Sequence, residues 1–370
     1  MMNIPFVDLK AQYQSIKPEM DEMISNVINE TAFIGGIYVK EFEAKFAKVY
    51  GVKHVISCAN GTDSLYIIMR SLGIGLGDEV ITAANSWISS SETIGQTGAT
   101  PVFVDCDEQY MSMDVAQLEA AITAKTKALI VVHLHGQICE MEAFEQLAKK
   151  YGLYVIEDCA QSHFSEYNGK RAGTMGVAGS FSFYPGKNLG AYGDAGCIIT
   201  NDDDLANNCR MFANHGALVK HKHQIEGINS RLDGLQAGIL TVKLDHILNW
   251  TEKRIERADW YREALKDIPE ISIPEVRFYS KHSYHLFIIR TSQRNELMAF
   301  LKEKGVETAI HYPTPLPLLP AYSDRGFTST DYPVSFRMSA TMLSLPIYPE
   351  LSRQAVNYIA NTIQEFFAKQ

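Results

Sequence analysis

Short apolar runs alternate with amphipathic helical patterns over the first two-thirds of the sequence. The runs have the length of strands, and their near-continuous apolar character indicates burial on both faces. Alternating β and α elements predict a mainly parallel sheet covered by helices on both faces. The candidate strands are His54–Cys58, Glu79–Ala83, Pro101–Asp105, Ala128–His133, Leu153–Glu157, Gly179–Phe183 and Gly196–Thr200, and helix candidates between them include Thr62–Leu72, Asp114–Thr123 and Met141–Tyr151.

The pattern changes in the last third of the chain. Two long helical segments are predicted between Arg231 and Asp267, with a bend near Asn249–Trp250. Strand-like and helical runs then mix, as in a smaller α+β domain. We therefore expect a large domain over residues 1–245, including an N-terminal arm, and a small domain over residues 246–370. The runs in question are strand-like Ser283–Thr291, Val306–Ile310 and Met342–Pro346, and helical Asn295–Lys304 and Ser352–Ala368.

Composition and charge narrow the class of protein. A length of 370 residues suggests about two domains. The net charge of −9 argues against a nucleic-acid partner, which needs clustered Lys and Arg. Hydrophobic and charged shares of 46% and 21% are ordinary for a soluble globular protein. No apolar run approaches the ~20 residues of a membrane span, and the N-terminal residues lack a secretory signal pattern. We expect a cytoplasmic protein without a membrane partner.

Cysteine and histidine spacing gives little support to a metal site. No two cysteines form a CxxC pair, and most lie in or beside apolar strand-like runs. We predict buried free thiols in a reducing compartment, with disulfides or a zinc site as the alternatives. Two histidine pairs lack the neighbouring ligands that would support a metal, so we expect no metal. The pairs are His133/His135 and His221/His223, and the cysteines are Cys58, Cys106, Cys139, Cys159, Cys197 and Cys209.

Small residues follow the first candidate strand at the point where a helix begins. In open α/β sheets, ligands bind at the carboxyl ends of the strands. The turn ANGTDS, at residues 59–64, leaves backbone N–H groups free at a helix N-terminus. Such a turn suits a phosphate, although an ordinary helix cap has the same composition. By contrast, the GIGLG run at residues 73–77 follows a helix and precedes a strand, which is the wrong order for a dinucleotide-binding loop.

Two further strand ends carry the residues of a covalent cofactor site. Asp158 directly follows an apolar strand, and Lys187 lies in a Gly- and Pro-rich loop after an aromatic strand. Either residue alone is ordinary, but together with a phosphate turn they match the needs of pyridoxal phosphate (PLP). Its phosphate needs N–H and hydroxyl donors, its ring nitrogen a carboxylate, and its aldehyde a lysine.

Several long motifs give the chain a specific resemblance. DCAQ at residues 158–161, FSFYPGKNLGAYGDAG at 181–196 and NSRLD at 229–233 resemble the DegT/DnrJ/EryC1/StrS family of PLP-dependent nucleotide-sugar aminotransferases. IPFVDLKAQY at 4–13 and HYPTPLPLLPAY at 311–322 are also similar, so the resemblance covers nearly the whole chain. It implies the fold type I architecture of aspartate aminotransferase: a mainly parallel large-domain sheet and a smaller α+β C-terminal domain.

The resemblance assigns roles on the cofactor side of the site. It implies that Lys187 is the Schiff-base lysine and proton shuttle, that Asp158 pairs with the pyridine nitrogen, and that Gln161 contacts the ring hydroxyl. Trp87 corresponds to an aromatic residue stacked on the ring face, with core packing as the alternative. The residues implied to hold the phosphate are Gly61, Thr62 and Ser182.

On the substrate side, the resemblance implies that two subunits share each site. Asn229 would reach the phosphate bound by the neighbouring subunit of a homodimer. Arg231, His311 and Tyr312 match positions that line the substrate side, and Arg231 could receive a carboxylate of glutamate. An ion pair at the dimer interface is the alternative role of Arg231. The role of His163 stays open, since a structural histidine fits its position equally well.

The implied reaction is a ping-pong transamination from L-glutamate to a nucleotide-linked keto-sugar. The HYPxPLxLxPAY motif looks more like family members that aminate C-3 of a dTDP- or UDP-linked (6-deoxy)hexose than like those that aminate C-4. A sugar dehydratase on the same scaffold carries His where Lys187 stands, so the lysine argues against it. An alternative outside the enzymes is a non-catalytic binding or regulatory protein with the PLP fold. The presence of both Asp158 and Lys187 argues against this alternative as well.

Overall fold

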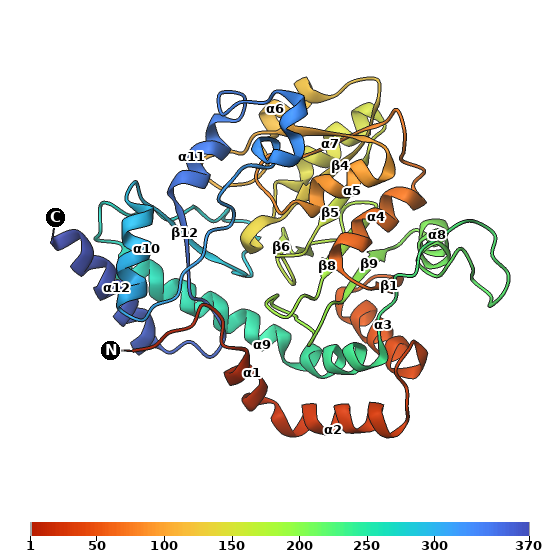
Figure 1. The fold of residues 1–370 in the computed structure, drawn as a ribbon, viewed down its shortest axis with the longest axis horizontal. Helices are drawn as coiled ribbons and strands as arrows, with labels where there is room; N and C mark the ends of the chain where they lie inside the picture. The colour runs from red at the N-terminus through yellow and green to blue at the C-terminus, as the bar shows by residue number, and fades with distance from the viewer. Residues whose placement is uncertain (1, 370) are drawn as a thin grey trace.

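A seven-stranded, mainly parallel sheet forms the centre of the molecule in a computed structural model, which describes residues 2–369 (Figure 1). Its strand order is β1-β9-β8-β5-β4-β2-β3, and only β9 runs antiparallel to its neighbours. The predicted strands are confirmed to within two residues at either end. The bounds are β1 His54–Cys58, β2 Glu79–Ala83, β3 Thr100–Val104, β4 Thr126–Val132, β5 Tyr154–Asp158, β8 Ala178–Ser182 and β9 Gly196–Thr200.

Helices cover both faces of this sheet, as the apolar strands require. Successive side chains of a strand point to opposite faces. In β4, Leu129 and Val131 enter a core shared with α2, α3, α7 and α9, while Ala128, Ile130 and Val132 enter a second core shared with α4, α5 and α8. The helices have the bounds α1 Leu9–Ser15, α2 Lys17–Asn29, α3 Gly36–Tyr50, α4 Gly61–Ser71, α5 Ser89–Thr97, α6 Val115–Ala121, α7 Met141–Tyr151, α8 Asp203–Ala213 and α9 Gly234–Leu265.

Helix α9 corrects one expectation from the sequence. The two predicted segments form one helix of 32 residues that passes through Asn249 and Trp250. No Gly or Pro interrupts the helix there, and Thr251 donates a side-chain hydrogen bond to the carbonyl of Ile247 at 2.9 Å. Helix α9 packs against α2 and α3 along one side of the molecule (Figure 1). None of the helices within residues 2–369 combines the length and the apolar character needed to cross a bilayer.

The C-terminal part forms a third core around a two-stranded antiparallel sheet. Helix α10 matches its predicted run to within one residue, but strand β11 covers only Phe287–Arg290 of the predicted strand-like run Ser283–Thr291. Val306 and Ala309 make only isolated bridges in place of the predicted strand at 306–310. Helix α9 contributes Trp250 to the core of the large sheet and Tyr261 to this third core. The domain boundary at residue 245 stays a prediction. The remaining bounds are β6 Glu166–Tyr167, β7 Lys170–Arg171, β10 Ser280–Lys281, β11 Phe287–Arg290, β12 Met342–Leu345, α10 Arg294–Glu303, α11 Pro333–Thr341 and α12 Arg353–Ala368.

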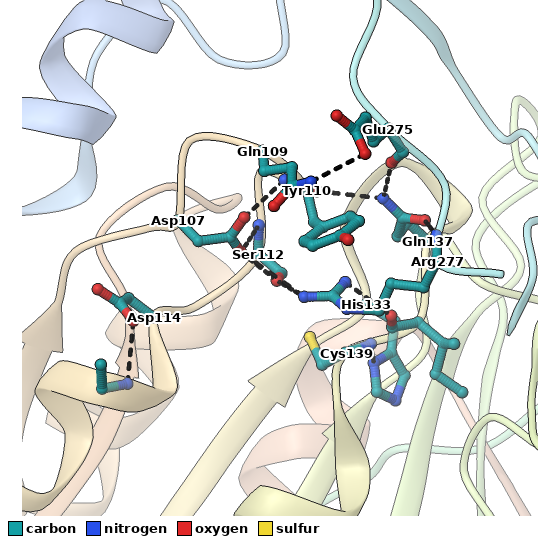
Figure 2. A network of polar contacts seen from close by, with 12 residues as sticks. Asp107, Gln109, Tyr110, Ser112, Asp114, His133, Gln137, Cys139, Glu275 and Arg277 are labelled. Carbon is teal, nitrogen blue, oxygen red and sulfur yellow. Dashed lines mark hydrogen bonds and ion pairs between the residues drawn. The ribbon is translucent and has the colours of Figure 1, made fainter. Parts of the chain in front are cut away.

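Polar contacts tie the large sheet to the segment that leads into the C-terminal part (Figure 2). Arg277 donates to the hydroxyl of Ser112 at 3.0 Å, and its guanidinium lies 4.0 Å from the ring centroid of Tyr110. Gln137, in the turn after β4, donates to the carbonyl of Glu275 at 2.7 Å. The turn after β3, the turn after β4 and the segment around Arg277 are therefore held together at the carboxyl edge of the sheet.

Asp105 makes a second such connection, between the end of β3 and helix α11. This buried carboxylate accepts hydrogen bonds from the backbone N–H groups of Cys106, Val334 and Ser335, at 2.8–2.9 Å, and from the hydroxyl of Ser335 at 2.5 Å. Two of the N–H groups belong to the first turn of α11, where a negative charge is stabilising. One carboxylate thus fixes this helix against the large sheet.

Replacing Asp105 should therefore cost more stability than replacing an exposed capping residue. We expect Asp105→Ala to lower the free energy of unfolding by about 3 kcal/mol, because it leaves several buried donors without an acceptor. Asp114→Ala is the control, since it removes the cap of α6, where the side chain accepts from the N–H of Ala116 at 2.9 Å, together with one exposed hydrogen bond from Gln117 at 2.8 Å. That loss should be about 1 kcal/mol. Chemical denaturation measures both, and equal losses would contradict the role of Asp105.

Candidate active site

The turn between β1 and α4 forms the predicted anion site. Asn60 is the N-cap of α4, and its side chain accepts the N–H of Asp63 at 2.8 Å. Gly61 and Thr62 form the first turn of this 11-residue helix, so the positive end of the helix opens into the site. The hydroxyl of Thr62 lies 2.7 Å from that of Ser89, at the start of α5.

Gly61 is required by the close approach of the neighbouring strand β8. A Cβ atom on Gly61 would lie 2.6 Å from Cβ of Ser182, closer than real side chains allow. The sequence-predicted phosphate residues Gly61, Thr62 and Ser182 therefore lie together, although Ser182 is more than a hundred residues away in sequence. Below them, the hydroxyls of Ser64 and Ser180 are hydrogen bonded to each other.

Asp158 ends β5 as a buried carboxylate. Its Oδ1 accepts the N–H of Ala160 and its Oδ2 the hydroxyl of Ser90, both at 3.1 Å. Burial raises the pKa of Asp158, while the N–H of Ala160, the charge of Lys187 and the hydroxyl of Ser90 lower it. The carboxylate is therefore placed where a cationic partner would lower its pKa most effectively.

Lys187 lies in the connection between β8 and β9. Burial lowers the pKa of its amine to about 8, against the effect of the Asp158 charge, which raises it. A substantial fraction of this amine is therefore neutral near physiological pH, as a nucleophile or a general base requires. The connection is compact, since a Cβ on Gly190 would lie 2.3 Å from the carbonyl oxygen of Pro185.

Gln161 links the end of β5 to the C-terminal part of the chain. Its Oε1 accepts the N–H of His135 at 2.7 Å, and its Nε2 donates to the hydroxyl of Tyr312 at 3.0 Å. The Tyr312 ring lies 5.5 Å from that of Trp87, between centroids. Trp87 is 57% exposed, which contradicts the core-packing alternative and leaves its ring available to a ligand.

These residues line one cavity of about 830 Å³, large enough for a cofactor and a substrate together. His311 lies in its wall, with Nδ1 at 2.8 Å from the hydroxyl of Ser344 and its ring stacked on that of Phe6 at 5.7 Å. Burial lowers the pKa of His311 to about 3, so the imidazole is neutral. The N-terminal segment thus completes a wall of the site. The predicted residues that line the cavity are Gly61, Thr62, Trp87, Asp158, Gln161, Ser182, Lys187, His311 and Tyr312.

Asn229 and Arg231 are the two predicted site residues outside this cavity. Both are exposed, whereas Ser230 between them is buried. Ser230 donates to Asp63 at 2.7 Å and accepts the N–H of Ala59 at 3.1 Å, so it fastens the segment to the phosphate turn. Neighbours of an inward-pointing residue in an extended segment point the other way. Their side chains therefore leave this chain's own site.

His163 lies in the protein core. Its ring packs against those of Phe181 and Phe183, at 5.5 and 5.7 Å between centroids, and its two nitrogens have no hydrogen-bond partner within residues 2–369. Burial lowers its pKa to about 3, so the imidazole is neutral. Of the roles that the sequence allows for His163, these surroundings favour packing in the core.

A buried group of His133, Glu157 and Cys159 has the spacing of metal ligands. Protein donors, however, already occupy the Glu157 carboxylate. It accepts the imidazole of His133 at 3.0 Å, and also three backbone N–H groups at 2.6–2.7 Å, those of Gly173, Met175 and Gly176. Hydrogen bonding therefore accounts for this group. All six cysteines are buried free thiols, as expected from the sequence.

Several site residues could not be found from the sequence. Ser90, which donates to Asp158, carries only the weak signal of being near a strand end, whereas Asn60, which caps α4, belongs to the predicted ANGTDS turn. Asn188 follows Lys187 directly, yet nothing in the sequence pairs it with His285, which lies almost one hundred residues later and also lines the cavity. Such pairs become visible only when the fold brings the segments together.

The residues of the cavity fit PLP. A helix N-terminus with glycine and hydroxyl side chains can take its phosphate, the buried carboxylate of Asp158 its ring nitrogen, and the amine of Lys187 its aldehyde. The buried carboxylate offers strong support, because it costs free energy unless a cation meets it. The class defined by the fold and the site is thus a PLP enzyme of the mainly parallel α/β type.

Comparison with known proteins agrees with this class. The sequence matches the DegT/DnrJ/EryC1/StrS aminotransferase family over residues 14–364, and the chain belongs to this family of PLP-dependent aminotransferases. The solved structure of DesV from S. venezuelae, in complex with a ketimine intermediate, superposes with a TM-score of 0.97 at 38% identity and covers 100% of both chains. The expected fold type I architecture is therefore confirmed.

Two curated relatives are similar over nearly their whole length. The pleiotropic regulatory protein of Geobacillus stearothermophilus is 45% identical over 99% of this chain and 99% of its own. The dTDP-3-amino-3,6-dideoxy-alpha-D-galactopyranose transaminase of Aneurinibacillus thermoaerophilus is 42% identical over 98% of this chain and 99% of its own.

The effect of Asp158 on Lys187 can be measured in the cofactor-free protein. Labelling of Lys187 by acetic anhydride should rise with a midpoint at about pH 8, since only the neutral amine reacts. Asp158→Asn should move this midpoint lower, because the carboxylate charge raises the pKa of the amine. Asp194→Asn is the control: Asp194 lines the same cavity but does not act on Lys187, so the midpoint should stay. Mass spectrometry gives the labelling, and an unchanged midpoint in Asp158→Asn would contradict the coupling.

Proposed function

We propose that the protein transfers an amino group from L-glutamate to C-3 of a keto-sugar linked to dTDP or UDP, with a 6-deoxyhexose as the preferred sugar. The main support for this proposal is the cavity, which joins Lys187, Asp158 and the N-terminus of α4 and leaves room for a large second substrate. The relative from Aneurinibacillus thermoaerophilus supports C-3, because its name describes a 3-amino sugar.

In this proposal Asp158 and Lys187 have separate roles in the reaction. Bound PLP supplies an electron sink that stabilises negative charge at the carbon next to the reacting nitrogen. The carboxylate of Asp158 keeps the ring nitrogen protonated, since an opposite charge favours the charged form. The amine of Lys187, whose lowered pKa leaves a fraction of it neutral near physiological pH, takes and returns the proton. Trp87 and Tyr312 line one side of the cavity with their rings 5.5 Å apart between centroids.

We further propose a homodimer with shared sites. Glutamate carries two carboxylates, yet Lys187 is the one Lys or Arg lining the cavity in the part of the chain described here. Arg231 of a second copy would supply the missing positive charge, and Asn229 of that copy would reach the phosphate. The outward direction of both side chains, set by the inward anchor of Ser230, supports this arrangement.

We place the domain boundary within α9, near residue 245, because the apolar side chains of this helix pass from one core to the other beyond Trp250. We place the enzyme in the cytoplasm, because all six of its cysteines are free thiols, which persist in a reducing compartment.

The name of the Geobacillus stearothermophilus relative favours one other function, that of a regulatory protein. The complete set of Lys187, Asp158 and a phosphate cradle argues for catalysis, because a protein that only binds would have no use for a nucleophilic amine. Turnover separates the two functions, and it also separates amination at C-3 from amination at C-4.

The first test is a substrate panel. The pyridoxamine phosphate form of the enzyme, mixed with nucleotide-linked 3-keto or 4-keto sugars, should return to the pyridoxal form only with 3-keto sugars linked to dTDP or UDP. Lys187→Ala should abolish this reaction, and borohydride reduction followed by peptide mapping should place the cofactor on Lys187. Faster turnover of 4-keto sugars would contradict C-3, and a cofactor on another lysine would contradict the site.

Mixed dimers test the shared site. Lys187→Ala and Arg231→Ala should each be inactive alone, because one lacks the nucleophile and the other the carboxylate partner. After subunit exchange about half of the dimers are mixed, and each mixed dimer holds one intact site of two. Activity should therefore recover to about a quarter of wild type. No recovery, despite exchange shown by differently tagged subunits, would mean that Arg231 acts within its own chain.

A further inference from the structure

His285 is a cavity residue that takes no part in the proposed binding of PLP or in the proposed proton transfer. It lies in the segment before β11 and lines the same cavity as Lys187. Its backbone is held from two directions. Arg254, buried in α9, donates to the carbonyls of Tyr284 at 3.1 Å and Ile347 at 2.9 Å, and a Cβ on Gly136 would lie 2.9 Å from the N atom of His285. The backbone that carries the imidazole is therefore held in a fixed position.

The hydrogen bonds of Asn188 determine which nitrogen of His285 carries the proton. The Nδ2 of Asn188 donates to the carbonyl of Ser283 at 3.0 Å, and a carbonyl can only accept. The Oδ1 of Asn188 must then face His285, whose Nδ1 lies 3.2 Å away. Two acceptors would repel, so Nδ1 of His285 carries a hydrogen and donates it to Asn188.

The other nitrogen is then an acceptor that is free to take a hydrogen bond. Burial and the positive charges of Lys187 and Arg254 hold the pKa of His285 well below its usual range, so the ring is neutral. In a neutral imidazole with hydrogen on Nδ1, Nε2 has a free lone pair. Within residues 2–369, Nε2 has no protein partner and is not sealed in the interior.

The lone pair of Nε2 can bind only a hydrogen-bond donor, so it distinguishes between the chemical groups of a substrate. The substrates considered are those of the proposed function, on which this inference rests. Phosphate and carboxylate oxygens are acceptors and would be repelled. Sugar hydroxyls are donors. His285 lies close enough to feel the charge of Lys187, and the carbon that is aminated must reach Lys187. The hydroxyls nearest to that carbon are those on its two neighbours in the sugar ring.

We propose that His285 is a specificity-determining residue whose Nε2 accepts a hydrogen bond from the sugar hydroxyl next to the keto carbon, with Asn188 as the residue that fixes the imidazole. For a 3-keto sugar this is the hydroxyl at C-2 or at C-4. The contact orients the keto carbon toward Lys187, and it favours sugars that keep this hydroxyl over sugars that have lost it.

Two substitutions of His285 separate the acceptor function of Nε2 from the hydrogen bond that Nδ1 donates to Asn188. In His285→Asn, the shorter amide can keep the donor to Asn188 but has no acceptor at the position of Nε2. In His285→Gln, the longer amide can place an oxygen near the position of Nε2. Cofactor affinity of the cofactor-free proteins, measured by titration with PLP, checks that both variants keep an intact site.

The substrates are a dTDP-linked 3-keto-6-deoxyhexose and its 2-deoxy and 4-deoxy counterparts. On the parent sugar, His285→Asn should lower kcat/KM by about 10- to 100-fold, the loss expected when a hydrogen bond in a buried site is left unmade. His285→Gln should lose less. On one of the two deoxy sugars, His285→Asn should be as good as wild type, because the hydroxyl it would have bound is missing.

The outcomes distinguish this inference from the proposed function. Equal losses on all three sugars would overturn the inference alone, since a merely structural role of His285 affects every substrate alike. Unchanged kcat/KM on the parent sugar would also overturn it. If wild type aminates none of the three sugars but does aminate 4-keto sugars, the proposed function fails, and this inference fails with it.

Discussion

The attraction between the carboxylate of Asp158 and the amine of Lys187 is the interaction on which the site depends. Each group loses hydration in the cavity, and each shifts the other's pKa toward the charged form. Burying either charged group without the other would cost considerable free energy. The sheet brings them together because β5 and β8 are adjacent, and because Lys187 lies in the connection that follows β8.

Much of the fold could be predicted from the sequence, since two-sided burial leaves a clear pattern. The apolar runs at β1, β2 and β9 match the observed strands residue by residue. The same holds for α7, which begins at Met141 after a strand end and stops before Gly152 in the left-handed conformation. Asp158 and Lys187 could be found for a related reason, because strand ends are where an open α/β sheet presents its functional side chains.

What could not be predicted depends on contacts between distant segments. The run at 306–310 has the composition of a strand, but its neighbours offer only single bridges, so composition alone misled. The bend expected near Trp250 is absent because tertiary packing on both sides keeps α9 continuous. The pairing of Asn188 with His285, and the anchoring of Ser230 to Asp63, involve residues with no local pattern at all.

The continuity of α9 has a mechanical consequence. Its 32 residues make a rod about 48 Å long, at about 1.5 Å per residue. One end is embedded in the core beside the large sheet and the other in the C-terminal core. A continuous helix shared by two cores resists bending, so the two halves cannot swing apart at residue 245 without breaking helical hydrogen bonds. Any opening of the cavity must then come from the loops and the N-terminal segment at its rim, and the two halves should melt as one unit.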